Sequence, residues 1–111
     1  MTERVEIIKQ ILVLPIGMSL DDDEARHYGV VVEWRGPQTD DGAGGYAVTR
    51  FGESLSRAGN WAWPERYQYR QYRWATLDEA LSAARAAVDH VKVNGMTYAE
   101  FSERMSAASE G

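Results

Sequence analysis

Large aromatic rings and arginines are concentrated in one stretch of the chain, residues 61–74. This stretch holds three of the four tryptophans and three of the six tyrosines, together with three arginines. Exposed rings stack on unpaired bases, and arginines bind phosphates or stack as cations. Tryptophan, tyrosine and arginine are also enriched among the residues that dominate the energy of protein interfaces. The stretch therefore predicts a binding surface and leaves two classes of partner open.

A protein partner is the first of these classes. We expect it to contact the side chains of Trp61, Trp63, Arg66, Tyr67, Tyr69, Arg70, Tyr72 and Arg73. The alternative is a nucleic acid, bound by single-strand stacking or by a sheet that enters a groove. The contacts with a nucleic acid would come from Arg50, Arg57, Arg70 and Arg73. A third interpretation gives the stretch no partner, because its rings would only fill the core and cover the second face of a sheet.

Residues suited to catalysis are few. The chain has no cysteine, which excludes thiolate nucleophiles and thiolate-bound zinc. Neither of its two histidines, His27 and His90, lies in a catalytic motif. The acids at 21–24 lack the ligand spacing of a calcium loop, and the glycines at 42–45 lack the lysine of a phosphate-binding loop. We therefore predict a non-enzymatic protein with no catalytic residue, no metal and no cofactor.

Charge is distributed unevenly along the 111 residues. The net charge is −5 at pH 7, yet residues 50–74 carry five arginines and two glutamates, a local net of +3. Such a positive segment can steer a partner towards it even when the whole chain is anionic. No stretch approaches the roughly 20 apolar residues that a membrane helix needs, and the N-terminal residues make a poor signal peptide. We expect a cytoplasmic protein without a membrane partner.

The binding surface must be positioned by helices and strands. Their order in the sequence predicts a single α+β domain over residues 1–111. Apolar residues in 3–14 fit one helical face, so we expect an N-terminal helix, followed by an acidic loop up to residue 27. A buried strand is the rival interpretation of 3–14, because the segment is rich in Ile and Val. Residues 28–74 predict an antiparallel sheet of three or four strands, in which the aromatic stretch supplies the third and, in the larger sheet, the fourth. Pro64 would mark an edge, a bulge or a break between these two.

Two capping motifs predict the remaining helices. Thr76 with Glu79 opens a helix over 76–92, whose alanine-rich face should pack closely on the sheet. Thr97-Tyr-Ala-Glu100 opens a shorter helix over 97–108. The second face of the sheet is then either covered by the N-terminal segment or left open. An open face or an edge strand would also allow a homodimer.

The order of these motifs resembles that of small uncharacterised proteins of actinobacteria and their bacteriophages. The resemblance covers residues 28–101 and rests on the segments 28–36, 46–50 and 74–81 with the closing 93–98. It implies an accessory or host-interaction role in a phage or its host. Strands followed by Thr-x-x-Glu-Ala also resemble arm-type DNA-binding domains of phage integrases, which insert a sheet into a groove. This chain departs from them in its negative charge and its two lysines.

Overall fold

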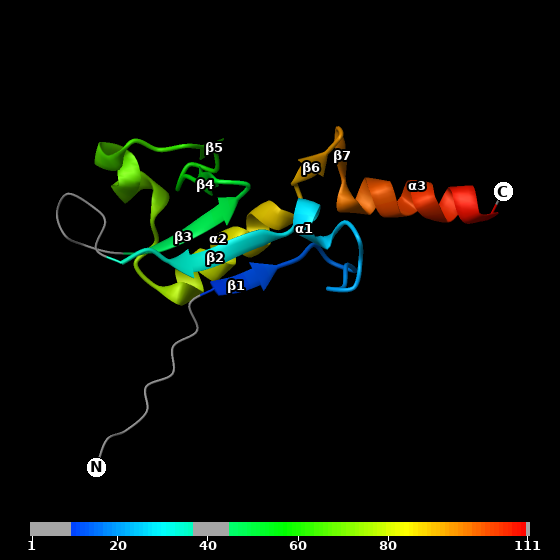
Figure 1. Ribbon diagram of the computed structural model, residues 1–111, viewed down its shortest axis with the longest axis horizontal. Coiled ribbons are helices and arrows are strands. Elements are labelled where there is room, and N and C mark those ends of the chain that lie inside the picture. The colour runs from blue at the N-terminus through cyan, green and yellow to red at the C-terminus, as the bar shows by residue number, and fades with distance from the viewer. Residues whose placement is uncertain (1–9, 37–44, 111) are drawn as a thin grey trace, which may run out of the picture.

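The fold is an antiparallel sheet with one long helix packed on it and a second helix projecting from one end. The computed structural model describes residues 10–36 and 45–110. Five strands pair in chain order; they are β1 (Gln10–Val13), β2 (Val30–Trp34), β3 (Tyr46–Arg50), β4 (Glu53–Leu55) and β5 (Trp61–Ala62). A short hairpin of β6 (Lys92–Val93) and β7 (Met96–Thr97) leads into α3 (Tyr98–Glu110), which extends away from the sheet (Figure 1).

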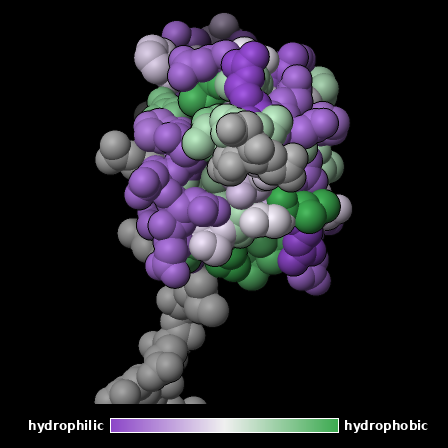
Figure 2. All heavy atoms as spheres, turned by 90° about the vertical axis from the view of Figure 1, so that its right-hand side faces the viewer, coloured by the Kyte–Doolittle hydropathy of each residue, from purple (hydrophilic) through white to green (hydrophobic). Residues whose placement is uncertain are grey.

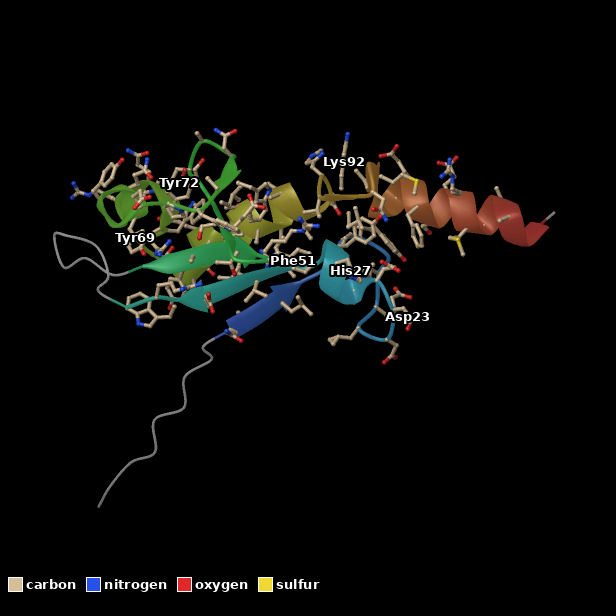
Figure 3. The ribbon with its side chains drawn as sticks, turned by 45° about the horizontal axis from the view of Figure 1, so that its top comes forward. Asp23, His27, Phe51, Tyr69, Tyr72 and Lys92 are labelled. Carbon is tan, nitrogen blue, oxygen red and sulfur yellow. The ribbon has the colours of Figure 1, made fainter. Side chains whose placement is uncertain are left out.

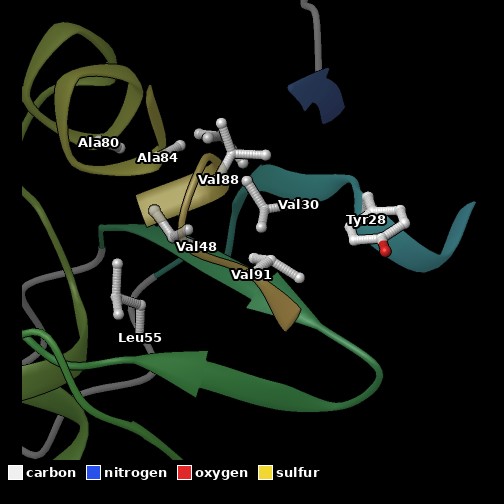
Figure 4. Packing of buried hydrophobic residues seen from close by; sticks show 9 residues of the cluster. Tyr28, Val30, Val48, Leu55, Ala80, Ala84, Val88 and Val91 are labelled. Atoms are coloured by element: carbon white, nitrogen blue, oxygen red, sulfur yellow. The ribbon is translucent and has the colours of Figure 1, made fainter. Parts of the chain in front are cut away.

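The helix α2 (Leu77–Val88) covers one face of the sheet (Figure 1). Side chains alternate along a strand, so every second residue of β2 and β3 points towards the helix. Val30, Val32 and Val48 lie on this side and are completely or almost completely buried. They pack against Ala80 and Ala84 of α2, both fully buried (Figure 4). Alanine at these positions allows the helix axis to approach the sheet closely, as the sequence predicts.

Thr76 is confirmed as an N-cap, and Thr97 with Glu100 is confirmed as a capping box. The Thr76 hydroxyl accepts a hydrogen bond from the Glu79 amide at 3.2 Å, at the start of α2. At the start of α3 the Thr97 amide donates to the Glu100 carboxylate at 3.1 Å, and the Glu100 amide donates to the Thr97 hydroxyl at 3.3 Å. The helix α2 ends at Val88, earlier than the predicted residue 92, because the chain turns there to begin β6.

The predicted N-terminal helix is wrong for the residues that the structure describes. Gln10–Val13 forms strand β1, paired antiparallel with β2 in the register Leu12 to Val31. The backbone groups of this Ile- and Val-rich segment form hydrogen bonds with the outer edge of β2. A local sequence pattern does not reveal this pairing, because the partner residues are about 20 positions away. Residues 1–9 of the predicted helix lie outside the described part. A four-residue helix, α1 (Ala25–Tyr28), connects β1 to β2.

The prediction for the aromatic stretch is also corrected. Only Trp61–Ala62 is strand, and after Pro64 the chain forms a 3-10 helix, η1 (Arg66–Tyr72). Its first turn is closed by Glu65, whose amide donates to the Gln68 side chain at 2.9 Å. The chain then returns to the sheet through a single bridge between Trp74 and Tyr46.

Within the described residues the sheet has five strands and not three or four, because β1, where the sequence predicts a helix, and β4 both belong to it. The strand β4 lies between β3 and β5. It follows a two-residue turn in which Phe51 and Gly52 both have positive φ, 50° and 84°. This backbone matches the twist of a tight hairpin. The turn brings Arg50 opposite Glu53.

Candidate binding surface

The three tryptophans of the aromatic stretch are not on one surface. Trp61 and Trp74 are half-buried and pack against the core on the α2 side of the sheet. Trp63 is 74% exposed. The difference arises because β5 ends at Ala62, two residues before Pro64. The alternation that would give Trp61 and Trp63 the same environment therefore stops between them.

Arg73 is an internal residue. Its side chain is only 6% exposed, and its Cζ lies 4.7 Å from the centroid of the Tyr69 ring. Its Nη1 donates to the Tyr72 carbonyl at 2.9 Å. Burial lowers the pKa of the Arg73 guanidinium, and the nearby charge of Arg35 lowers that pKa further. The guanidinium is therefore used to hold η1 on the sheet, and it is not presented to a partner.

A glycine makes room for Arg73. A Cβ atom on Gly45 would lie 2.9 Å from the Arg73 Cβ, closer than real Cβ contacts allow, and 3.0 Å from the Trp74 carbonyl oxygen, which is tighter than most of them. Because Gly45 has no Cβ, the backbone at residue 45 can approach Arg73 and Trp74 closely, which permits the bridge between Tyr46 and Trp74.

Two further arginines of the predicted nucleic-acid surface bind backbone carbonyls. The Nε of Arg57 donates to the Arg73 carbonyl at 2.8 Å. Arg50 donates from Nε and Nη2 to the His27 carbonyl at 3.2 and 2.9 Å, and its Cζ lies 4.9 Å from the Phe51 ring centroid. Burial lowers the pKa of Arg50. Arg70 of the same predicted set has an exposed side chain.

The remaining rings of the stretch belong to η1. Tyr67 is as exposed as Trp63, whereas Tyr69 and Tyr72 are half-buried; the side chain of Arg66 lies outside the described part. Figure 3 places Tyr69 and Tyr72 near the beginning of β3, and Phe51 near its end. The predicted contact residues are thus divided between two ends of the sheet.

Large exposed hydrophobic side chains gather at the second of these ends, on the face that α2 leaves open. We name Leu12, Leu20, Phe51 and Trp63 the open-face patch; their exposed fractions lie between 42% and 74%. Three of them, Leu12, Leu20 and Phe51, surround a hollow of about 400 Å³. Trp63 lies beside the turn that carries Phe51, because its Nε1 lies 3.6 Å from the position that a Cβ on Gly52 would occupy.

The floor of the hollow is the open face of the sheet itself. Val31 and Thr49 line it and lie opposite each other on β2 and β3. Asp22 and Asp23 line the side formed by the acidic loop. Figure 2 shows hydrophobic surface between hydrophilic side chains on the end of the molecule from which α3 projects.

Sequence reasoning singled out Trp63 but missed Leu12, Leu20 and Phe51. Phe51 carried one local signal, the Gly52 that follows it, because glycine directly after an alternating strand marks a turn. The exposure of Leu12 has no local signal, since it depends on the pairing of β1 with β2.

No cluster of potential metal ligands occurs among residues 10–36 and 45–110. Within the same ranges, no helix is long and apolar enough to cross a membrane. No protein-family model, curated protein or solved structure matches the chain. The resemblance to actinobacterial and phage proteins therefore stays a prediction.

Proposed function

We propose that this protein is a small non-enzymatic binding protein that contacts a protein partner through the open-face patch. The observation that carries the proposal is the gathering of Leu12, Leu20 and Phe51 around one hollow, with Trp63 beside them. Single exposed hydrophobic side chains are ordinary on protein surfaces. A contiguous group around a hollow is typical of an interaction site. A phage accessory or host-interaction role, which the resemblance implies, requires only such a module.

The patch is held in place before any partner arrives. Phe51 sits in a tight turn, and the adjacent Arg50 is fixed by two hydrogen bonds to the His27 carbonyl. The His27 and Phe51 rings are in contact, with centroids 6.1 Å apart. A surface that is already ordered loses less conformational entropy on binding. Aromatic side chains presented in this way are the usual energetic centres of interfaces.

Charge around the hollow indicates the chemistry of the partner. Asp22 and Asp23 line the hollow, and Arg50, its one lining base among the described residues, is bonded to a carbonyl. An acidic margin favours a partner with Lys or Arg beside its apolar residues. We therefore expect an apolar segment flanked by basic residues to occupy the patch.

The test is a pull-down with the full-length protein, repeated with variants that remove one ring each. Trp63→Ala and Phe51→Asn should each reduce recovery of the partner at least about tenfold, since central aromatic contacts carry about 2 kcal/mol or more. Asparagine is chosen at position 51 because it tolerates positive φ. Tyr67→Ala is the matched control, an equally exposed ring on η1.

Two outcomes would contradict the proposal. If the partner is lost with Tyr67→Ala and kept with Trp63→Ala, the contact runs through η1 instead. If recovery disappears when the lysate is treated with nuclease, the partner is a nucleic acid. The geometry favours that alternative less, because Arg50, Arg57 and Arg73 all bind carbonyls within the fold.

A further inference from the structure

A second hollow lies on the other face of the sheet, beside α2. It is a cleft of about 490 Å³ between this helix and the segment that runs from the end of β4 to the start of β5. We name it the tryptophan cleft, because Trp61 and Trp74 line it opposite alanines of α2; these alanines are Ala83, Ala86 and Ala87. Its volume falls within the range of about 300–1,000 Å³ that is usual for small-molecule sites.

The cleft exists because of the residue sizes on its two walls. Alanines on this side of α2 leave space that larger side chains would fill, and the broad rings of Trp61 and Trp74 stay half-buried at its edge. Flat apolar walls of this kind suit a ring or a short hydrocarbon chain, which would bury area against both walls.

Arg57 supplies the charged group of the cleft. Its Nε donates to the Arg73 carbonyl at 2.8 Å, and its backbone amide donates to the Gln71 carbonyl at 2.9 Å. These two bonds fix the position of an exposed guanidinium and direct Nε away from a ligand, so its Nη groups are the donors for an incoming oxygen. Arginine presents such donors in a geometry that matches a carboxylate.

Two further polar side chains line the cleft, the buried Ser56 and the exposed His90. None of the described lining residues is acidic. The Ser56 hydroxyl accepts from the Asn60 amide at 3.0 Å, which keeps the turn between β4 and β5 in place. A cleft with apolar walls, a fixed cation and no acid favours an anionic ligand over a neutral or cationic one.

We propose that the tryptophan cleft binds a small organic acid, with its apolar body between the tryptophans and the α2 alanines and its carboxylate on Arg57. This site is independent of the open-face patch, because the two lie on opposite faces of the sheet. Either proposal can fail while the other stands.

The four tryptophans make a site-resolved experiment feasible. The ¹⁵N-labelled full chain is titrated with 4-phenylbutyrate and, as the uncharged match, with 4-phenylbutan-1-ol, while the indole N–H signals are followed by NMR. The acid should shift the signals of Trp61 and Trp74 and leave that of Trp63 unchanged. The alcohol should bind about tenfold more weakly, the loss of one charge-assisted hydrogen bond of about 1.4 kcal/mol.

Variants separate the two parts of the proposal. Ala86→Leu adds bulk from an exposed position of the cleft wall and should abolish the shifts, whereas Ala99→Leu, the same change at an exposed position on α3, should not. Arg57→Gln should remove the preference for the acid over the alcohol. The proposal is overturned if Trp61 and Trp74 do not respond at about 5 mM acid, if Ala86→Leu binds normally, if Trp63 alone responds, or if acid and alcohol bind equally to the unaltered protein.

Discussion

The guanidinium of Arg73 stacks on the ring of Tyr69, with the Cζ atom 4.7 Å from the ring centroid. Both residues belong to the stretch that the sequence marks as a contact surface, yet here they contact each other. The pair joins η1 to the end of the sheet, and the Arg73 carbonyl in turn accepts the hydrogen bond that fixes Arg57. Some of the aromatic and basic residues in 61–74 therefore have a structural role. They hold the 3-10 helix η1 against the sheet, because η1 has no regular strand pairing to do so.

Replacement of Arg73 tests this structural role. Arg73→Ala should lower the free energy of unfolding by about 2 kcal/mol, since it removes a buried hydrogen bond and a cation–π contact. The measurement is urea unfolding followed by tryptophan fluorescence. Arg104→Ala, which removes an exposed arginine from α3, is the control and should change stability by no more than about 0.5 kcal/mol. Equal losses in the two variants would mean that Arg73 has no special structural role.

The packing of α2 gives a second prediction. Ala84 is fully buried against Val30 and Val48, so Ala84→Leu forces the helix away from the sheet and should cost about 1–3 kcal/mol. Ala86→Leu makes the same change at an exposed position of the same helix and should be nearly neutral. Thermal unfolding of both variants, monitored by circular dichroism, measures the difference. A neutral Ala84→Leu would show that α2 does not pack as tightly as its burial indicates.

Local sequence was sufficient where the structure depends on neighbouring residues. Thr76 with Glu79 and Thr97 with Glu100 form hydrogen bonds across three positions, so the starts of both helices could be predicted. The apolar spacing of α2 also predicted which face it buries. Glu65 and Gln68 form a similar capping pair at the start of η1. This pair was not predicted, because the aromatic residues around it favour a strand.

Distant contacts decided the parts that the sequence did not predict. The apolar positions around Ile11 fit a helix as well as a strand, and only the available edge of β2 selects the strand. The exposure of Phe51 and Trp63 likewise follows from which face α2 covers and where β5 ends. The open-face patch is defined by which side chains are exposed, and that exposure depends on the arrangement of the whole sheet. The patch as a whole could therefore not be predicted from the local sequence.

The nucleic-acid alternative makes a prediction that depends on salt. With a net charge of −5 and with Arg50, Arg57 and Arg73 bonded within the fold, the protein should show no binding to a fluorescent single-stranded oligonucleotide at protein concentrations up to about 100 µM in about 150 mM salt. Fluorescence anisotropy provides the measurement. Binding that weakens steeply between about 50 and 200 mM salt, and that Arg70→Gln reduces, would instead restore this alternative.

Acidification should affect α3 through Glu100. Hydrogen bonds from the backbone amide and the hydroxyl of Thr97 are the main causes that lower the pKa of the Glu100 carboxyl from its ordinary value of 4.5. A carboxyl whose pKa is lower in the folded state stabilises that state above its unfolded pKa, and the stabilisation is lost as the pH falls through the folded pKa. The start of α3 should therefore stay ordered down to pH 4.5 and loosen only below it.

The Thr97 amide signal reports this transition directly in an NMR pH titration, and its midpoint should lie below 4.5. Glu100→Gln retains a side chain that can accept the same hydrogen bond but cannot titrate, so the transition should disappear in this variant. Glu103→Gln removes an acid from the same helix and leaves the capping pair intact, so the transition should persist. A midpoint at or above 4.5 in the unaltered protein would show that the pair of Thr97 and Glu100 does not stabilise the charged carboxylate.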